Sequence, residues 1–448
     1  MIDSVAYVIY GAASGIIHFF IWIFSVPWLA WFWSLVGTCL LGYIAFKLWM
    51  HYIRQDFISG IDWVLLEIVP PRDVLRSPKA MELFISNALY HFSVKGGRET
   101  YWQGAVWFWF SLEIASIDGQ VHFYVRTPSR LKEFIETQMY AQYPQAQVKV
   151  VDDYTLAVDE ITPKSAWNLW GAEFKLVKHE AYPIKTYVDY GLDKDPKEEF
   201  KVDPISPVIE LFGSLQKGEQ MWLQIVVTPS KKEYRTKGSH FWQKHSKKYH
   251  DWVKESKNEI AKLLKPFTSV KDEGARIEIR VPDFYKKSVE GLAGKAHKLG
   301  FDTGIRVCYV AKKDVFKYNN RKNLRLIFRQ YENPSINGFT RFNSTQADAY
   351  GGFFLASQKT IMMLANRMLH EYRNRSFFHP PLRHKLFNVR TIFWPFSALF
   401  KPYFHSETFV LNTEELATIW HFPGQILKVP TLERIESKEA TPPPNLPI

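Results

Sequence analysis

The chain has 448 residues, a formal net charge of +12 and only two cysteines. Cys39 and Cys308 lie in unlike parts of the sequence, which excludes a disulfide framework and fits a reducing cytoplasm. The charge is local: residues 231–265 carry a net +7 and residues 312–329 a net +6, so the rest of the chain is close to neutral.

The chain starts with an uncharged run of 43 residues, 4–46. One membrane crossing takes about 20 residues, so this run is long enough for two. Pro27 interrupts it, and proline breaks a helix because it lacks an amide N–H. We therefore expect a membrane anchor at 1–56, made of helices at 5–24 and 28–49. A re-entrant first segment followed by a single crossing is the alternative.

Basic residues flank this run on one side only. Lys47 and Arg54 follow the second apolar segment, and no Lys or Arg precedes the first. The positive-inside rule therefore predicts that the soluble part lies in the cytoplasm, at the inner face of the cytoplasmic membrane. A cleaved signal peptide fits poorly, because its apolar region would be only about 7–15 residues long and would follow a basic stretch.

Residues 57–160 are predicted to form a first α+β module. The expected strands are at 62–71, 105–116, 120–128 and 147–154, and the expected helices are at 77–92 and 128–144. Asp118-Gly119 separates the two middle strands and is a strong hairpin signal. The resulting order β-α-β-β-α-β is that of a ferredoxin-like module.

A weaker echo of this order follows at 161–345. Residues 206–215, SPVIELFGSL, repeat the Ser-Pro opening and the Glu-Leu-Phe of the first helix. Strands are expected within 173–190 and at 221–229, and residues 304–334 resemble the strand and helix of 119–144. A mostly helical insertion at 230–299 interrupts the middle hairpin. The predicted fold class is α+β: N-terminal transmembrane helical segments followed by two ferredoxin-like modules, the second carrying the insertion.

Two segments complete the predicted organisation. Residues 346–408 form a helical region that is rich in aromatic and basic side chains, and residues 409–448 end in a Pro-rich tail. The tail, ATPPPNLPI, has the composition of a polyproline II linker.

Both basic clusters contain interleaved aromatic residues, a pattern that suits phosphates of nucleic acid or of anionic lipids. Solvated helix faces and aromatic residues of the core are the alternative interpretation. The predicted nucleic-acid or anion contacts are Lys244, Lys247, Lys248, Lys254, Lys317, Arg321, Lys322, Arg325 and Arg329.

Motifs of catalysis are not found in this sequence. The nearest match to a P-loop, residues 291–296 (GLAGKA), has Ala296 in place of the Mg-binding hydroxyl and lies in a helix-like stretch. His379 and His384 have no neighbouring Cys or carboxylate at metal-ligand spacing. Asp152-Asp153 after a strand suggests a solvated turn. We expect a non-enzymatic chain with no metal and no cofactor.

Two stretches carry a resemblance to a known family. Residues 123–155 and the segment FVLNTEELATIWHFPG at 409–424 resemble membrane-linked ATPases of conjugation and type IV secretion, in the HerA/FtsK superfamily. In that family the second element precedes the Pro-rich linker into the motor domain. The resemblance therefore implies motor-docking residues, which are Leu411, Glu415, Leu416, Ala417, His421 and Pro423.

The chain stops at Ile448, where the motor of that family would begin, so no residues match its Walker A and Walker B motifs. We expect the motor to be a separate chain or a missing domain. The resemblance implies a membrane-anchored, non-catalytic component of a DNA or protein translocation machine that assembles the ATPase, with homo-oligomerisation in a ring. A stand-alone membrane-bound protein that binds nucleic acid or anionic lipid is the alternative.

Overall fold

The computed structural model describes residues 27–71, 76–91, 96–193, 202–230, 252–265, 283–345, 358–379 and 406–424. The chain divides into two compact units. Unit 1 comprises residues 1–61 together with 94–106, and unit 2 comprises residues 62–93 and 107–448.

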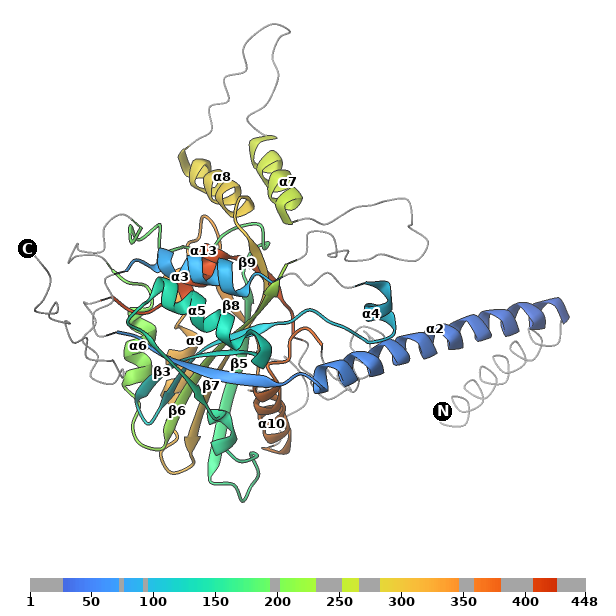
Figure 1. Cartoon of the computed structure of the whole chain (residues 1–448), viewed down its shortest axis with the longest axis horizontal. Helices are drawn as coiled ribbons and strands as arrows, with labels where there is room; N and C mark the ends of the chain where they lie inside the picture. Colours follow the sequence, from blue (N-terminus) through green and yellow to red (C-terminus); the bar gives the residue numbers. More distant parts are fainter. Residues whose placement is uncertain are drawn as a thin grey trace, which may run out of the picture. The chain divides into compact units, whose positions relative to one another are not determined.

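Unit 1 is built on one long helix, α2, which runs from Pro27 to Ser59 (Figure 1). At 1.5 Å per residue it spans about 50 Å, and from Trp31 onward it is long and apolar enough to cross a membrane. The predicted helix at 28–49 is confirmed, but the helix continues to Ser59. Residues 50–59 contain no proline or glycine that would end it earlier, and Gly60 follows its last residue. The predicted helix at 5–24 lies outside the described residues. The short helix α4, Gly97–Tyr101, also belongs to unit 1.

Unit 2 contains one antiparallel sheet, which has nine strands in the part of the chain that the structure describes. The strands are β1 Trp63–Val69, β2 Phe110–Ile117, β3 Gln120–Pro128, β4 Gln147–Val151, β5 Trp167–Leu176, β6 Glu219–Pro229, β7 Gly300–Lys312, β8 Phe339–Ser344 and β9 Phe409–Asn412. Their order is β4-β1-β3-β2-β6-β7-β5-β8, and β9 pairs with β7. The expected mixed α+β class is confirmed.

The sheet consists of two halves with the same strand order. Numbered within each half, β4-β1-β3-β2 and β8-β5-β7-β6 both read fourth, first, third, second. The halves join where β2 pairs with β6, from Phe110↔Val227 to Ile117↔Gln220. The insertion lies where the sequence indicates, because β6 ends at Pro229, β7 begins at Gly300 and the two strands pair.

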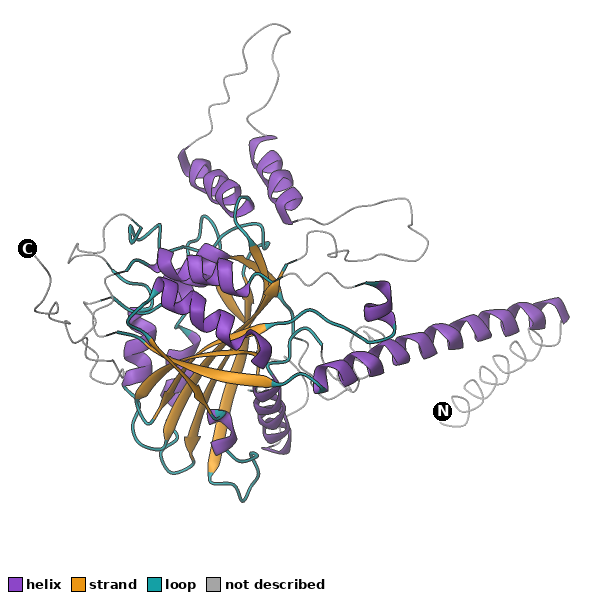
Figure 2. Cartoon of the chain, viewed as in Figure 1, coloured by secondary structure: helices purple, strands orange, loops and turns teal. Residues whose placement is uncertain are grey.

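Helices cover both faces of the sheet (Figure 2). Five helices contribute side chains to the main core on one face: α3 Pro78–Phe84, α5 Lys132–Gln142, α6 Ser206–Gly213, α9 Tyr318–Arg325 and α13 Thr413–Ile419. α10, Gln358–Asn374, covers the other face through Leu364, Met368 and Tyr372. The insertion contributes α7 Trp252–Leu264 and α8 Asp283–Ala296, which pack together. Short turns of helix are η1 Ile85–Leu89, η2 Ser129–Leu131, η3 Tyr154–Ala157 and η5 Arg329–Tyr331.

The predicted strands of the second half are corrected in one place. Strands were expected within 173–190, but β5 starts earlier, at Trp167, and residues 177–193 form turns. Pro183 and Gly191 favour turns there, and a hydrogen bond from the Val177 amide to the Gly338 carbonyl closes the end of β5.

The predicted hairpin at Asp118-Gly119 is confirmed, since both residues have positive φ and β2 pairs with β3 around them. A Cβ at position 119 would lie 2.5 Å from the Leu215 carbonyl oxygen, which is backbone and cannot move aside easily. Gly119→Ala is therefore expected to lower the free energy of unfolding by about 1–3 kcal/mol, measured by chemical denaturation. Exposed Gly97→Ala is the control, because nothing lies near its added Cβ. Equal stability of both variants would contradict this reading of the turn.

Candidate functional site

Residues 406–424 form a C-terminal element that is folded into unit 2. β9 pairs with the first residues of β7, and α13 follows directly and packs on α3. A capping box fixes the junction: Asn412 Oδ1 accepts the Glu415 N–H at 2.8 Å, and the Glu415 carboxylate accepts the Asn412 N–H at 2.8 Å. The capping box therefore places the start of α13 directly after the last residue of β9.

The predicted motor-docking residues lie inside this element, and all of them are buried. They are Leu411, Glu415, Leu416, Ala417, His421 and Pro423. His421 Nε2 lies 2.9 Å from Asp203 Oδ1, and its Nδ1 lies 2.8 Å from the Ala417 carbonyl oxygen. Burial alone would raise the pKa of Asp203, but the contact with His421 holds it below its ordinary value. These side chains fix the element to its own unit, and their docking role stays a prediction.

A fully buried ion pair joins the C-terminal element to the insertion. Lys295 on α8 has its Nζ 3.0 Å from Glu415 Oε2 and also donates to the Val410 carbonyl at 3.0 Å. The Ile184 N–H donates to Glu415 Oε1 at 2.9 Å. Burial raises the pKa of Glu415, and the charge of Lys295 offsets this rise in part. The Glu415 carboxylate thus connects α13 to α8 and to the turn at Ile184, segments that are distant in the sequence.

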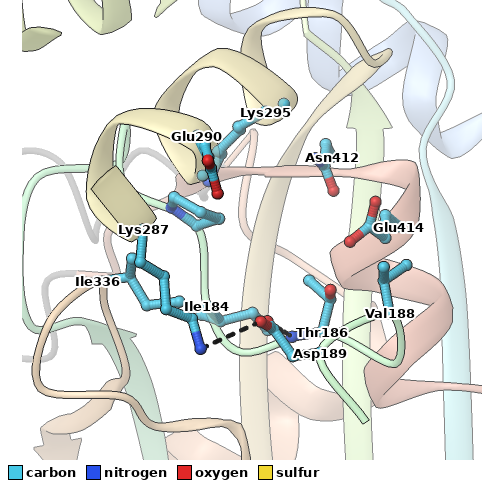
Figure 3. Close-up of a pocket in the computed structure, with 13 residues that line it drawn as sticks. Ile184, Thr186, Val188, Asp189, Lys287, Glu290, Lys295, Ile336, Asn412 and Glu414 are labelled. Carbon is cyan, nitrogen blue, oxygen red and sulfur yellow. Dashed lines mark hydrogen bonds and ion pairs between the residues drawn. The ribbon is translucent and has the colours of Figure 1, made fainter. Parts of the chain in front are cut away.

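A cavity of about 220 Å³ lies beside this ion pair (Figure 3). Its walls come from α8, from the 183–189 turns and from the start of α13. The polar groups at its rim bind one another: Lys287 lies 3.5 Å from Asp189, whose carboxylate also accepts the Thr186 N–H at 3.0 Å. Glu414 at the rim is 2.6 Å from Lys298. Most of the charged groups that line the cavity are therefore already paired with other residues.

A second polar cluster is buried on the sheet face that α10 covers. Glu113 on β2 faces Arg375 just after α10, with Nε–Oε1 at 2.9 Å and Nη2–Oε2 at 3.1 Å. Arg375 also pairs with Asp153, and Tyr154 donates to Glu113 at 2.8 Å. Although burial favours its neutral form, the Arg375 charge and hydrogen bonds hold the pKa of Asp153 below its ordinary value. Asp153 is therefore a half-buried structural partner of Arg375, and the expectation of a solvated turn is corrected for it.

A third cluster lies on the same face. Arg306 on β7 donates to Glu173 at 2.7 Å and to Glu371 at 2.8 Å, and all three side chains are buried. The Arg306 guanidinium also stacks on the Phe377 ring, 3.7 Å from its centroid. Together with the Glu113 cluster, this arrangement attaches α10 to the sheet by charge as well as by apolar packing.

The predicted anion-contact residues fall into three groups. Lys244, Lys247 and Lys248 lie outside the described residues. Lys254 is exposed on α7, and the other five residues lie on α9 or next to it.

The α9 group is only partly available to a ligand. Lys322 and Arg329 are exposed, whereas Lys317 pairs with Glu219 at 3.0 Å. Arg321 stacks on the exposed Tyr318 ring at 4.5 Å, and Arg325 is half-buried over an aromatic ring of the sheet. Lys312 and Lys313, which precede this group in the sequence, are exposed as well, and so is the Tyr318 ring.

Sequence analysis missed β9 and the buried ion pairs. The pattern Asn412-x-x-Glu415 before an apolar run is a capping-box signal and could have located the start of α13. The partners of Lys295, Arg306 and Arg375 are far away in sequence, so no local pattern indicates them. Among the residues that the structure describes, no group of three or more His, Cys, Asp or Glu side chains could hold a metal ion.

The fold and these clusters define a mixed α+β protein with an apolar N-terminal helix and a structurally integrated C-terminal element. Residues 108–432 match the family model described as "Domain of unknown function (DUF8128)". Because this match covers more than half of the chain, the protein belongs to that family. No curated protein matches the chain.

Proposed function

We propose that the chain is a membrane-anchored, non-catalytic component of a conjugation or type IV secretion-like translocation machine. Its work is to hold a HerA/FtsK-type ATPase at the cytoplasmic face of the membrane and to help the ATPase assemble as a ring. The observation that carries the proposal is the integration of residues 406–424, through β9 and the Glu415–Lys295 pair. A partner attached to residues beyond Gly424 has a fixed base in unit 2.

The membrane side of the proposal is supported by α2. The helix is apolar, and its candidate membrane-spanning stretch is not buried in the protein. Lys47 and Arg54 follow the apolar part, and by the positive-inside rule they favour the cytoplasm for the rest of the chain. The cytoplasmic membrane of a bacterial or archaeal cell is the membrane that fits a translocation machine of this kind.

We also propose that unit 2 is a tandem of two ferredoxin-like modules. The support is the shared strand order of the two sheet halves, with a helix after the first and after the third strand of each half. Two related modules in one chain have similar surfaces. Such surfaces suit the repeated contacts between neighbouring subunits in a ring of identical chains.

The function is tested by purifying the full chain from its native membranes after cross-linking. The expected result is recovery of a chain that carries G-x-x-x-x-G-K-[ST], together with self-cross-links of the protein. A chain truncated after Gly424 should lose this ATPase while keeping unit 2 folded. Recovery of nucleic acid or anionic lipid without any ATPase would instead support the stand-alone binding protein.

A role in guiding DNA rests on the exposed basic surface at α9. The double variant Lys322→Glu with Arg329→Glu is expected to weaken binding of single-stranded DNA by the full chain in detergent. The slope of log affinity against log salt should fall by about one unit for each phosphate that the variant no longer binds.

The matched control is Lys149→Glu with Lys164→Glu, which makes the same charge change at exposed positions elsewhere in unit 2. The measurement is fluorescence anisotropy with a labelled oligonucleotide over a salt series. An equal loss of affinity in both double variants would show a general charge effect and would remove α9 as the contact surface.

A further inference from the structure

Helix α2 changes character near its middle. It carries no charge up to Phe46, and then Lys47, Arg54 and Asp56 follow within two to three turns. A hydrocarbon core is about 30 Å thick and takes about 20 helical residues. A span that enters the core near Pro27 therefore leaves it near Phe46, and the turns that follow lie at the depth of the lipid headgroups.

The loop that carries α4 packs on α2 at this level (Figure 1). Gly104 has φ +66°, and a Cβ there would lie 2.2 Å from the Ile53 carbonyl oxygen, so the loop backbone contacts the helix directly. The Tyr101 ring lies 6.4 Å from the Phe46 ring. Met50 and Ile53 are buried, unlike their neighbours on α2. The loop thus runs along α2 from the end of the apolar part into the charged part.

The exposed side chains of this loop include two aromatic residues, together with Arg98 and Glu99, whose charges are opposite. Trp102 is 72% exposed and Tyr101 is 54% exposed, and Arg98 is exposed beside them. On α2 at the same level, Tyr52 is 66% exposed and Trp49 is 46% exposed. Single exposed aromatic residues are ordinary, but two on α2 and two on the adjoining loop at the same level are typical of an aromatic belt at a membrane interface.

We propose that residues 96–104 form a second membrane contact, which lies in the headgroup layer beside the end of α2 without crossing the bilayer. Trp102 and Tyr101 occupy the glycerol and carbonyl region, where an amphipathic ring is favourable. Arg98, with Lys47 and Arg54, contacts lipid phosphates. The contact fixes the depth and the rotation of α2. It rests on the proposed membrane anchoring, because it requires α2 to span the bilayer.

The test uses a polarity-sensitive nitrobenzoxadiazole label on the full chain in phosphatidylcholine–phosphatidylglycerol vesicles. Cys39 is a native, exposed labelling site on α2, whereas Cys308 is buried and burial raises the pKa of its thiol, so it does not react. In a Cys39→Ser background, Trp102→Cys and, separately, Arg98→Cys place the label on the loop. Exposed Lys164→Cys is the aqueous reference.

The label at 102 or 98 is expected to emit at shorter wavelength than the label at 164. Lipids with a nitroxide near the headgroup should quench it more strongly than lipids with a nitroxide near the chain end. The label at Cys39 should show the opposite order. Arg98→Cys keeps both loop aromatics, so a local defect caused by the loss of Trp102 does not obscure the result.

Three outcomes overturn the inference and are distinguishable. If Cys39 is quenched by deep nitroxides while both loop labels are quenched only by aqueous iodide, the anchor stands and the loop contact is wrong. A loop label shielded from iodide and from lipid nitroxides alike would show a protein partner there instead of lipid. A label at Cys39 that remains in water would overturn the membrane anchoring itself.

Discussion

Replacing Arg375 by methionine is expected to lower the free energy of unfolding of unit 2 by about 3–5 kcal/mol, because it leaves a buried carboxylate without its counter-charge. Glu113 is fully buried and receives two hydrogen bonds from this guanidinium, and Asp153 is its second partner. Methionine keeps most of the volume, so the effect reports the missing charge and hydrogen bonds rather than a cavity.

The loss of stability should depend on pH with a definite sign. Arg375 holds the pKa of Asp153 below its ordinary value of 3.8. A carboxylate with a lowered pKa stabilises the folded state above its ordinary pKa, and this contribution disappears as the pH falls through the lowered value. The difference between wild type and Arg375→Met should therefore be largest near neutral pH and smaller in acid.

The measurement is chemical denaturation of the full chain in detergent, followed by near-ultraviolet circular dichroism. The signal comes from the packed aromatic residues of the folded chain, which include Trp222 against Tyr154 and Tyr372 beside the cluster. Arg329→Met is the matched control, because Arg329 is exposed and a surface charge contributes little. The double variant Glu113→Gln with Arg375→Met should recover part of the stability. Equal stability of Arg375→Met and Arg329→Met would show that the cluster is not a stabilising element.

The parts of the fold that depend on local patterns could be predicted from the sequence. The order of strands and helices from β1 to β4 could be predicted, because the apolar periodicity and the Asp118-Gly119 turn lie within one continuous stretch of the sequence. The long apolar helix was predicted for the same reason, although its end was placed too early. The insertion was visible as a break between β6 and β7, strands that pair in space.

The rest depends on contacts between distant segments. β9 has only four residues, and it pairs with a strand more than 100 residues earlier, so its own sequence does not distinguish it from a loop. Glu113 lies in a strand whose two faces are both covered by helices, whereas alternation would have placed a charged side chain in solvent. A charged side chain is also not enough to predict exposure: Arg325 belongs to a basic run of the sequence, yet it is half-buried.

The cluster between α8 and α13 leads to the second large effect. Lys295→Met is expected to cost about 3–5 kcal/mol, because Glu415 then remains buried without its only close cation among the described residues. The loss should be local at first, since Lys295 also holds the Val410 carbonyl of β9. Hydrogen exchange should therefore become faster in residues 406–424 before it changes in β2 and β3.

The pH dependence of this variant separates it from a simple packing defect. Burial already raises the pKa of Glu415 above its ordinary value of 4.5, and Lys295 opposes that rise. Without Lys295 the pKa rises further, so Glu415 takes up a proton on folding, and the stability of the variant increases as the pH falls toward the ordinary value. The cost of Lys295→Met should therefore be smaller near pH 5 than near pH 8.

Two further variants make this test decisive. Lys287→Met changes a lysine on the same helix that is half-exposed and pairs with Asp189 at 3.5 Å. An ion pair in contact with solvent contributes little, so this variant should change the free energy of unfolding by at most about 1 kcal/mol. Lys295→Met combined with Glu415→Gln removes both charges and should abolish the pH dependence. If the pH dependence persists in that double variant, a group other than Glu415 causes it. The fixed base proposed for a motor would then rest on β9 pairing, on the His421–Asp203 contact and on apolar packing instead of on the Lys295–Glu415 pair.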